Sequence, residues 1–520
     1  MPETTLKIIK PRKYQQDIYE NCKGKNCLVV LPTGIGKTLI ALMLSIYTQK
    51  QHPATKTLFL APTRPLAEQH LEYFKKHLPE LFAELILFTG KINAETRKKL
   101  WETSDIIFST PQCISNDLKK NLYNLEDVSL LIEDECHRCL KNYAYTYVAR
   151  AYHEQAKNPK VLGLTASPGT TKEKIKQIAT NLGIEAIEMR TRNSDDVKEY
   201  LQELEFQTIR LEFPEEFRII DNLIKDIYNR KIQELKNRKL LFGPPIKTNI
   251  LRLQGTIMSS ITSGNKNFNM LMGASVCAQA IKLSHLIELL ETQTLYSSVN
   301  YIKSMFEQAA QKKSKAVQRI VKDPNFNQAY LKINELLARN IEHPKLLELK
   351  SLIQDEFKEK NKKKIMIFSQ YRDTITKICK TLNEIPNVKA KVFVGQAKKL
   401  GSGLSQKEQQ EILEEFKLGK INILVSSSIG EEGLDIVEVD SVIFYEPIPS
   451  TIRSIQRAGR TARLSKGKLI ILLTLDTLDE IFYYASRSRE KKMYKSIESI
   501  KKDLDKGKPL TTKPEQKTLF

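Results

Sequence analysis

Residues 27–44 read CLVVLPTGIGKTLIALML, and this stretch decides which fold the N-terminal part of the chain adopts. Its first six residues are nearly all apolar, as expected for a strand that is buried on both faces of a parallel sheet. Its last seven residues have a helical pattern. Between the two, Gly34 and Gly36 allow backbone N–H groups to turn inward around an anion, which the N-terminus of a helix also attracts. The stretch therefore predicts a strand, a phosphate-binding loop and a helix.

The loop carries the side chains that nucleotide binding requires. Lys37 would reach the β- and γ-phosphates, and the Thr38 hydroxyl would bind Mg²⁺. The full pattern GxxxxGK[ST] is not met, because Leu31 occupies the first glycine position. The shorter form TGxGKT between a strand and a helix is still specific. The predicted phosphate-loop residues are Thr33, Gly34, Ile35, Gly36, Lys37 and Thr38.

The same alternation of strands and helices continues to about residue 190. Further short apolar runs occupy residues 57–62, 85–89, 105–110, 129–134 and 161–167, and helical patterns lie between them. This alternation predicts a doubly wound α/β domain whose ligand site lies at the carboxyl ends of its parallel strands.

Residues 130–140, LLIEDECHRCL, follow one of these strands and allow two interpretations. Cys136 and Cys139 form a CxxC pair that would suit zinc or redox chemistry, but zinc needs further ligands, only His137 lies close in sequence, and no second CxxC exists. Asp134 and Glu135 stand at the carboxyl end of the strand, where one would bind Mg²⁺ and the other would polarise an attacking water. We therefore assign the site to the carboxylates and interpret Cys136 as a residue that fills space.

The pattern changes in the middle of the chain and returns near the end. Residues 215–345 have long helical patterns, and residues 221–340 carry 18 Lys and Arg against 8 Asp and Glu. Such a basic helical domain either contacts nucleic acid or is only a solvated surface. After 345, apolar strands are predicted at 364–369, 390–395, 421–427, 441–447 and 468–475, and a flexible Lys-rich tail from about 491.

The bulk composition agrees with a large protein that binds a polyanion. A chain of 520 residues is expected to form about three domains. Its 83 Lys and Arg against 61 Asp and Glu give a net charge of +22, which suits nucleic acid first and an acidic membrane surface second. Seven scattered cysteines fit reduced thiols, no signal peptide is evident, and no membrane-spanning helix is expected. We expect a soluble cytoplasmic protein that associates with the nucleoid.

Together these segments resemble the superfamily 2 helicases over most of the chain. The resemblance rests on motifs in the family's order: PTGIGKT (32–38), APTRPLAEQ (61–69), STPQ (109–112), DECH (134–137), LTASPG (164–169), IFSQYRDT (367–374), SSSIGEEGLD (426–435) and QRAGRTAR (456–463). A closer resemblance is to archaeal Hef and the FANCM-type helicases, through RKYQ (12–15), RTRNSDDVKEY (190–200) and residues 430–463. RIG-I-like RNA sensors share the DECH letters and a helical insert, so they remain the alternative.

The resemblance implies four regions. These are a RecA-like ATP-binding domain (1–200), a basic helical insertion domain (201–345), a second RecA-like domain (346–490) and the tail (491–520). Hef usually continues into an XPF-like nuclease, but no ERK-x-x-x-D pattern occurs in this sequence, so we expect no nuclease activity.

The family pattern also implies roles for individual residues in ATP hydrolysis. Arg12 and Gln15 would read adenine, and Gly433 and Asp435 would close on the ribose side. Lys37, Asp134, Glu135 and Gln456 would serve the reaction together with two arginine fingers from the second domain, Arg460 and Arg463. His137, Thr165 and Ser167 would couple the γ-phosphate to the second domain. The implied cofactors are ATP and Mg²⁺, held by Thr38 and Asp134.

Nucleic acid would contact the other edge of both RecA-like domains through its phosphate backbone. The residues that match the family positions for this contact are Arg64, Thr89, Gly90, Thr110, Pro111, Ser369, Gln370, Ser427 and Gly430. The last six residues, EQKTLF, resemble the front part of a sliding-clamp-binding peptide, with Gln516, Leu519 and Phe520 as its anchors. An unstructured terminus is the other interpretation of this tail.

The sequence thus predicts a monomeric ATP-dependent DNA helicase or translocase that remodels branched DNA, such as forks and junctions, during replication-fork repair. Two other functions stay open. One is an ATPase activated by double-stranded RNA, and the other is an ATP-gated nucleic-acid clamp that does not unwind.

Overall fold

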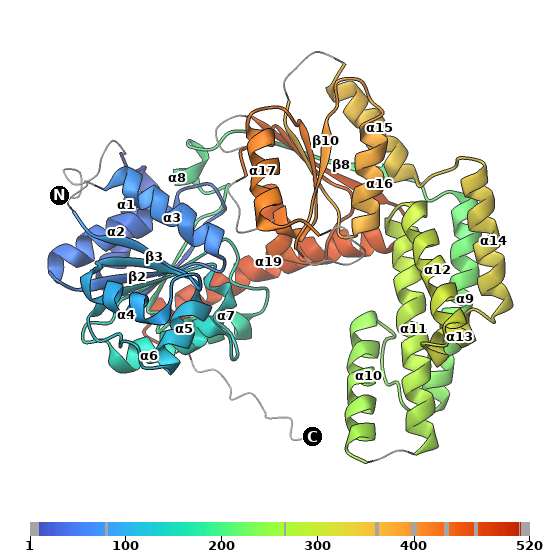
Figure 1. Ribbon diagram of the computed structural model, residues 1–520, viewed down its shortest axis with the longest axis horizontal. Helices are drawn as coiled ribbons and strands as arrows, with labels where there is room; N and C mark the ends of the chain where they lie inside the picture. The colour runs from blue at the N-terminus through green and yellow to red at the C-terminus, as the bar shows by residue number, and fades with distance from the viewer. Residues whose placement is uncertain are drawn as a thin grey trace.

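The computed structural model describes residues 10–78, 82–264, 267–358, 363–396, 403–430, 436–461, 466–508 and 510. Two helix-covered sheets lie next to each other, and a bundle of helices extends from the second of them (Figure 1). We call the first sheet domain lobe 1, the second lobe 2, and the bundle the insert. The expected fold, two RecA-like parallel-sheet domains with a helical insertion, is confirmed.

Lobe 1 contains a seven-stranded sheet in the order β3-β4-β2-β5-β6-β1-β7, with every pair of neighbours parallel. Its strands are β1 (Cys27–Val30), β2 (Lys56–Leu60), β3 (Leu85–Phe88), β4 (Ile106–Ser109), β5 (Val128–Asp134), β6 (Val161–Thr165) and β7 (Ala186–Met189). Six of these strands agree with the sequence prediction. The seventh, β7, was not predicted, because its polar Glu188 interrupts the apolar run expected of a buried strand.

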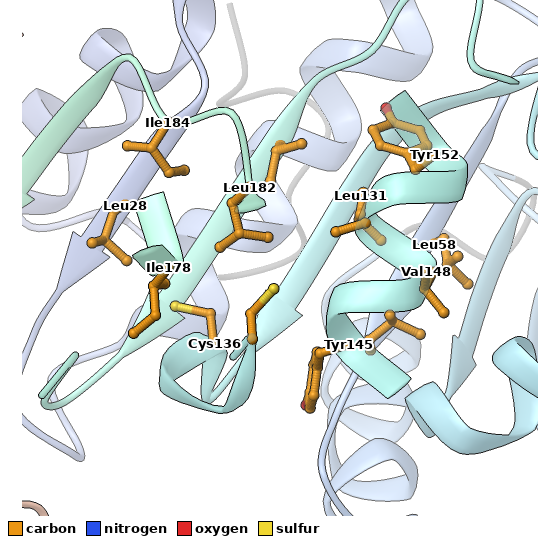
Figure 2. Close-up of a cluster of buried hydrophobic side chains, with 14 of the residues drawn as sticks. Leu28, Leu58, Leu131, Cys136, Tyr145, Val148, Tyr152, Ile178, Leu182 and Ile184 are labelled. Atoms are coloured by element: carbon orange, nitrogen blue, oxygen red, sulfur yellow. The ribbon is translucent and has the colours of Figure 1, made fainter. Parts of the chain in front are cut away.

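Helices cover both faces of this sheet. They are α1 (Lys13–Gly24), α2 (Lys37–Gln51), α3 (Arg64–His77), α4 (Ala94–Thr103), α5 (Pro111–Lys119), α6 (Ala144–Gln155), α7 (Lys172–Asn181) and α8 (Asp195–Lys198), with a 3₁₀ turn η2 (Cys136–Arg138). One face packs against α1, α2 and α3, and the other against α5, α6 and α7. Figure 2 shows the second core, in which Cys136 lies among Leu28, Ile178 and Leu182.

Lobe 2 contains a six-stranded parallel sheet in the order β10-β11-β9-β12-β13-β8. Its strands are β8 (Leu204–Leu211), β9 (Ile365–Phe368), β10 (Ala390–Phe393), β11 (Ile423–Ser426), β12 (Ser441–Phe444) and β13 (Gly467–Thr474). The boundary of the helical insertion domain at residue 201 is therefore too early, because β8 belongs to the sheet of lobe 2 and the first insert helix begins at Glu215. β8 escaped detection because it is a half-exposed edge strand with polar residues at alternate positions. The helices of lobe 2 are α15 (Pro344–Glu356), α16 (Arg372–Leu382), α17 (Gln406–Lys417) and α18 (Thr451–Ala458), with a 3₁₀ turn η3 (Ser428–Gly430).

The insert is a bundle built around one central helix, α11. Its helices are α9 (Glu215–Asn237), α10 (Lys247–Thr262), α11 (Phe268–Thr292), α12 (Leu295–Ala310), α13 (Lys315–Ile320) and α14 (Pro324–Ala338). Among the described residues, α11 is one helix that is long and apolar enough to cross a membrane, which the sequence analysis did not expect. Its side chains pack against α9, α10 and α12, so its composition is that of a bundle core.

The last helix among the described residues is the long α19 (Leu478–Asp505), which runs from lobe 2 back to lobe 1 (Figure 1). The prediction of a flexible tail from residue 491 is therefore wrong for residues 491–505. Met493, Ile497 and Ile500 are fully buried in the core of lobe 1. Their spacing places all three on one helix face, and the abundant lysines around them hid this face from the sequence analysis.

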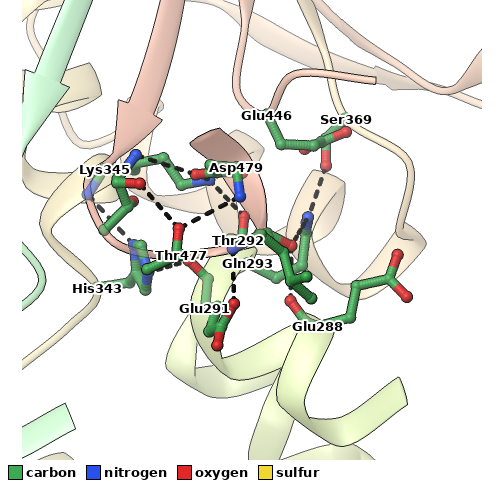
Figure 3. Close-up of polar contacts among 12 residues, drawn as sticks. Glu288, Glu291, Thr292, Gln293, His343, Lys345, Ser369, Glu446, Thr477 and Asp479 are labelled. Carbon is green, nitrogen blue, oxygen red and sulfur yellow. Dashed lines mark hydrogen bonds and ion pairs between the residues drawn. The ribbon is translucent and has the colours of Figure 1, made fainter. Parts of the chain in front are cut away.

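The insert meets lobe 2 through a buried polar network (Figure 3). The Lys345 ammonium lies 2.6 Å from Asp479 Oδ2 and donates to the Thr292 carbonyl oxygen at 2.6 Å, and all of Lys345 and Asp479 is buried. His343 lies 3.2 Å from the Glu291 carbonyl oxygen, and the Ser369 hydroxyl donates to Gln293 Oε1 at 3.3 Å. These contacts join α11, α15, α19 and β9 at one point.

Candidate nucleotide site and nucleic-acid track

The strand order of lobe 1 divides the carboxyl edge of its sheet into two halves. The phosphate loop follows β1, Asp134 ends β5, and Thr165 ends β6, and these three strands are neighbours. The predicted nucleic-acid contacts follow the other three neighbours, β2, β3 and β4. The fold therefore separates the predicted nucleotide residues from the predicted nucleic-acid residues although both sets are interleaved along the sequence.

The phosphate loop adopts the backbone shape that its glycines permit. Gly34 and Gly36 have φ of 84°, in the left-handed region that residues with a Cβ avoid. Gly36 also touches the Gln15 side chain, so a Cβ there would clash. α2 begins at Lys37, whose ammonium lies 3.5 Å from the Leu31 carbonyl oxygen across the loop. The N-terminus of α2 and the Lys37 charge thus face the same space, as anion binding requires.

Side chains at the start of α1 form hydrogen bonds with the backbone of the phosphate loop. Gln15 Nε2 donates to the Ile35 carbonyl oxygen at 3.3 Å, and its Oε1 accepts from the Arg12 backbone N–H at 2.9 Å. The Tyr14 hydroxyl donates to the same Ile35 oxygen at 2.6 Å. The Arg12 guanidinium lies over the Tyr200 ring, 5.1 Å from its centroid. Gln15 therefore contacts the phosphate loop directly, and Arg12 lies beside it at the start of the same helix.

The two carboxylates after β5 are both buried but held differently. Asp134 Oδ2 lies 2.9 Å from His70 Nε2, and the Tyr145 hydroxyl donates to the Asp134 carbonyl oxygen at 2.7 Å. Glu135 has φ of 52° and ψ of 44°, a left-handed conformation that costs a residue with a side chain about 1–3 kcal/mol. Such strain marks functional positions, and here it turns Glu135 away from the strand direction.

The surroundings of Glu135 favour its ionised carboxylate although the residue is buried. Burial acts to raise the pKa of this carboxyl, but the positive charge of Lys37 and the hydrogen bond with His137 outweigh burial and lower the pKa to about 2. Lys37 and Glu135 therefore lie close enough to interact strongly. A carboxylate in this position can orient a water beside a phosphate that Lys37 holds.

The predicted coupling residues form one cluster with Glu135. His137 Nδ1 lies 3.2 Å from both Glu135 Oε2 and Thr165 Oγ1, and the Thr165 hydroxyl lies 3.4 Å from Glu135 Oε2. The Ser167 backbone N–H donates to Thr165 Oγ1 at 3.1 Å. The Ser167 hydroxyl donates to Met493 Sδ of α19 at 2.8 Å, which connects the cluster to the helix that comes from lobe 2.

The CxxC pair is part of the core. Cys136 and Cys139 are fully buried, and burial raises the pKa of both thiols above the usual range. Within the described part of the chain, no group of three or more His, Cys, Asp or Glu side chains could hold a metal ion. Both cysteines therefore pack as small apolar residues in the hydrophobic core of lobe 1.

The residues beside the loop fit Mg²⁺, which the family implies. The Thr38 hydroxyl and the Asp134 carboxylate are hard oxygen ligands, and Asp134 keeps its second oxygen, Oδ1, outside the His70 contact. Mg²⁺ bound with a nucleotide takes few protein ligands and completes its shell with phosphate and water.

In lobe 2, the turn that follows α18 lies against the phosphate loop. Gly459 packs directly on the Thr33 side chain, so no larger residue fits between the lobes at this point. Gln456 and Arg460 are buried nearby, and Arg457 lies over the Phe368 ring at 4.9 Å, inside lobe 2. A cavity of about 890 Å³ lies next to this contact, between the two lobes and α19. Arg463, Gly433 and Asp435 lie outside the described residues.

The predicted nucleic-acid residues lie at neighbouring strand ends in both lobes. In lobe 1, Arg64 is the first residue of α3, Thr89 and Gly90 follow β3, and Thr110 caps α5 before Pro111. In lobe 2, Gln370 follows β9, and Ser427 and Gly430 follow β11, the neighbouring strand. Arg64, Thr89, Gln370 and Ser427 are at least partly accessible, and Gly90 is exposed.

Ser369 differs from these residues because it is fully buried. Its hydroxyl donates to Gln293, so we reassign Ser369 from the nucleic-acid track to the contact between lobe 2 and the insert. Gly430 and Pro111 are also buried, and only their backbones can take part in a surface. The clamp-binding residues Gln516, Leu519 and Phe520 lie outside the described residues.

Sequence reasoning missed two residues that the structure places in the site. His70 contacts Asp134 from α3, and Met493 contacts Ser167 from α19. His70 directly follows the motif at 61–69, and its position one residue beyond that motif was the only signal that the sequence offered. Met493 lies more than 300 residues from Ser167, and no local pattern could have paired them.

The fold and the site define a two-lobed nucleotide-dependent motor, and comparisons with known proteins identify its type. The DEAD/DEAH box helicase family model matches residues 12–175, the helicase conserved C-terminal domain matches 344–465, and a helical bundle of ATP-dependent RNA helicases matches 216–343. The crystal structure of the Pyrococcus furiosus Hef helicase domain is similar with a TM-score of 0.70 and 43% identity, covering 93% of this chain and 100% of that one.

Two curated relatives are similar over nearly the whole chain. An ATP-dependent RNA helicase, by its name, of Methanocaldococcus jannaschii is 37% identical over 498 residues, which are 95% of this chain and 61% of the relative. The ATP-dependent DNA helicase mph1 of Neurospora crassa is 33% identical over 479 residues, which are 89% of this chain and 41% of the relative. The chain thus spans about half the length of these relatives. It belongs to the DEAD/DEAH-box helicases and, among them, to the Hef type.

Proposed function

We propose that this chain is an ATP-dependent DNA helicase or translocase that remodels branched DNA, such as forks and junctions, in replication-fork repair. The observation that carries the proposal is the division of the carboxyl edge of lobe 1 into a nucleotide half and a nucleic-acid half, with lobe 2 closing on the first. The names of relatives favour this substrate, since mph1 of Neurospora crassa is called a DNA helicase. The protein would act in the cytoplasm, as a monomer on the chromosome.

Lobe 1 would bind and orient ATP. Backbone N–H groups of Gly34 to Thr38 and the Lys37 ammonium would hold the phosphates, while Arg12 and Gln15 would contact adenine. Bound Mg²⁺ would neutralise charge on the phosphates, held through Thr38 and Asp134. Glu135 would orient the attacking water and accept its proton as the bond to the γ-phosphate forms.

Lobe 2 would complete the site from the opposite side. Arg460 and Arg463 would serve as arginine fingers on the transferring phosphoryl group, which is worth about 10³–10⁵ in rate. Gly433 and Asp435 would close on the ribose. Gln456 would meet His137 across the cleft, and the cluster of His137, Thr165 and Ser167 would then carry the presence of the γ-phosphate to α19 and lobe 2.

Nucleic acid would lie across the strand ends β2–β4 and β9–β11. Contacts from hydroxyls and backbone N–H groups to phosphate carry no sequence information, so we expect binding that depends on structure and weakens with salt. Arg64, Thr89, Gly90, Thr110 and Pro111 would line the track in lobe 1. Gln370, Ser427 and Gly430 would line it in lobe 2.

The insert would add a contact that favours branched DNA. Residues 235–287 contain no Asp or Glu and carry seven Lys and Arg, and this acid-free stretch includes all of α10. Arg238 and Lys247 are paired with carboxylates outside the stretch, Glu234 and Glu288, but the stretch as a whole still has a net positive charge, which attracts a polyanion. We expect Lys236→Glu with Lys239→Glu, two exposed residues, to weaken binding of forked DNA and to leave ATPase without DNA intact. The exposed pair Lys417 and Lys420 on lobe 2, changed in the same way, controls for net charge. Equal loss in both variants would assign the effect to net charge, and no loss would leave the insert a solvated surface.

We also propose that the C-terminal residues Gln516, Leu519 and Phe520 dock on a sliding clamp. An apolar pair at the end of a basic segment is a suitable peptide ligand. Titration calorimetry of the full chain and of a variant without residues 515–520 tests this. Unchanged clamp affinity after the deletion would end the proposal.

A second candidate function, an ATPase activated by double-stranded RNA, is favoured by the name of the Methanocaldococcus relative. The test is the rate of Mg²⁺-dependent ATP hydrolysis with no nucleic acid, single-stranded DNA, linear duplex DNA, forked DNA and duplex RNA, with Glu135→Gln as the inactive control. We expect the strongest stimulation by forked DNA, followed by strand displacement. Strongest stimulation by duplex RNA would replace the DNA function, and stimulation without displacement would indicate an ATP-gated clamp.

A further inference from the structure

We infer that His70 is a positioning residue that holds the Asp134 carboxylate for Mg²⁺ and ties it to the nucleic-acid contact at the start of α3. The inference concerns the same site as the proposed function and rests on it for the nucleic-acid part. The part of the inference that concerns Mg²⁺ requires only that the chain binds a nucleotide.

The contact between His70 and Asp134 is short and shielded from water. His70 Nε2 lies 2.9 Å from Asp134 Oδ2, and the side chains of the two residues are 9% and 7% exposed. With the proton on Nε2, the imidazole donates to the carboxylate. In the low dielectric of a buried site such a hydrogen bond is stronger than in water and fixes the direction of the carboxylate.

The imidazole itself cannot rotate freely. Its ring lies on the Phe59 ring of β2, with centroids 4.5 Å apart and an interplanar angle of 36°. Phe59 in turn packs on Phe74 and Phe108, with centroids at 5.8 and 5.3 Å. These three phenylalanine rings therefore fix the position of the His70 imidazole, and the imidazole in turn fixes the Asp134 carboxylate.

Asp134 is held from two sides by different helices. The Tyr145 hydroxyl of α6 fixes its backbone carbonyl, and His70 of α3 fixes one carboxylate oxygen. The other oxygen, Oδ1, is left for the metal or its water. Partners of this kind behind a metal ligand are worth about 10–100-fold in metal affinity or activity.

α3 also connects this point to the nucleic-acid track. The helix begins at Arg64, a predicted phosphate contact, and His70 follows six residues later. Since an α-helix rises about 1.5 Å per residue, the two residues are separated by about 9 Å along the axis of the same helix. A phosphate that displaces or anchors the start of α3 therefore acts on the Asp134 carboxylate through His70.

The test compares three variants of the full chain. His70→Phe keeps a ring on Phe59 but removes the donor, and His70→Gln keeps a donor of similar reach. His77→Phe changes another buried histidine of α3, whose ring lies 4.6 Å from that of Tyr73, and controls for the loss of a buried histidine. Circular dichroism and thermal melting establish that each variant folds.

The first measurement is the Mg²⁺ concentration for half-maximal binding of a fluorescent non-hydrolysable ATP analogue. We expect His70→Phe to raise it about tenfold, and His70→Gln and His77→Phe to change it less than threefold. An unchanged Mg²⁺ requirement in a folded His70→Phe variant would reduce His70 to a residue that fills space. If His70→Phe fails to fold, Mg²⁺ dependence that is equal in His70→Gln and His70→Asn, whose shorter amide cannot reach Asp134, would overturn the assignment.

The second measurement is the ratio of ATPase rates with and without forked DNA in Arg64→Ala, His70→Phe and the double variant, with His70→Asn in place of His70→Phe if that variant does not fold. Coupling through α3 predicts that the two effects are not additive, whereas independent sites more than 7 Å apart add. Additive effects would remove the nucleic-acid part of the inference. If forked DNA does not stimulate the wild type, the proposed function fails, and the Mg²⁺ measurement still decides the role of His70.

Discussion

The insert and lobe 1 are both attached to lobe 2, but by opposite kinds of contact. The insert meets lobe 2 through buried hydrogen bonds, among them the one that Lys345, paired with Asp479 inside lobe 2, donates to the Thr292 carbonyl oxygen of the insert. Lobe 1 meets it through α19, whose Met493, Ile497 and Ile500 are apolar side chains in an apolar core. Hydrogen bonds have a narrow optimum of distance and angle, whereas apolar packing is not directional. We infer that lobe 2 and the insert move as one body and that lobe 1 moves against them.

Lys345→Ala is the change with the largest expected effect on this comparison. It leaves the buried Asp479 without its cation, and such a loss costs about 3–5 kcal/mol. We expect the free energy of unfolding, measured with urea, to fall by that amount. The double variant Lys345→Met, Asp479→Leu should recover most of it, because an apolar pair of similar volume needs no partner. A single variant as stable as the wild type would show that Lys345 does not stabilise the contact between lobe 2 and the insert.

The second prediction concerns pH at the same contact. Burial raises the pKa of Glu446 to about 7, although the positive charges of Arg457 and Lys345 oppose it. The unfolded chain ionises this group first, near pH 4.5, so its contribution to stability is complete at low pH and is lost as the pH rises through 7. A difference of one between the pKa values of the folded and unfolded chains corresponds to about 1.4 kcal/mol. Between pH 4.5 and 8, we expect Glu446→Gln to gain about 3 kcal/mol over the wild type. A stability difference that stays constant with pH would contradict the raised pKa.

Ile497→Val tests the apolar contact, and its expected effect is smaller. Ile497 is fully buried, and the loss of one methylene from a core costs about 0.5–1.5 kcal/mol. Ile481, on the same helix but 61% exposed, provides the matched control, since Ile481→Val removes the same group at the surface. We expect thermal melting to separate the two variants. Equal stability would place α19 outside the core of lobe 1.

The smallest effect is expected at the ion pair that flanks α19. Lys172 lies 3.0 Å from Asp503, and both side chains are partly exposed. Such exposed pairs contribute little to stability and are screened by salt. Lys172→Ala should therefore cost little at low salt and nothing measurable at high salt. A large loss that persists at high salt would make the attachment of α19 polar, like that of the insert.

The sequence was sufficient to predict those strands and site residues whose structure depends on neighbouring residues in the chain. Buried parallel strands form continuous apolar runs, so eleven strands were predicted, while the edge strand β8 and the polar β7 were not. The phosphate loop and the Asp134–Glu135 pair were predicted for the same reason, since each is one strand end with its own side chains.

Contacts between distant segments could not be read from the sequence. The apolar face of α19 lies among lysines, and its partner is lobe 1, which precedes it by about 300 residues. Ser369 matches a nucleic-acid motif, yet the insert buries it through Gln293. His70 contacts Asp134 only because α3 and β5 are packed together by the sheet. In each case tertiary packing, and no local preference, decides what the residue does.

We infer from these contacts that ATP and DNA move lobe 1 against a fixed unit of lobe 2 and the insert. Fluorescence energy transfer tests it between dyes on cysteines placed at exposed positions, Glu154 in lobe 1, Lys420 in lobe 2 and Ser263 in the insert, in a Cys379→Ser background that leaves six buried native cysteines. On addition of forked DNA and a non-hydrolysable ATP analogue with Mg²⁺, we expect the distance between the dyes at positions 154 and 420 to change. The distance between the dyes at positions 263 and 420 should stay the same. A change in the second distance as large as that in the first would contradict it.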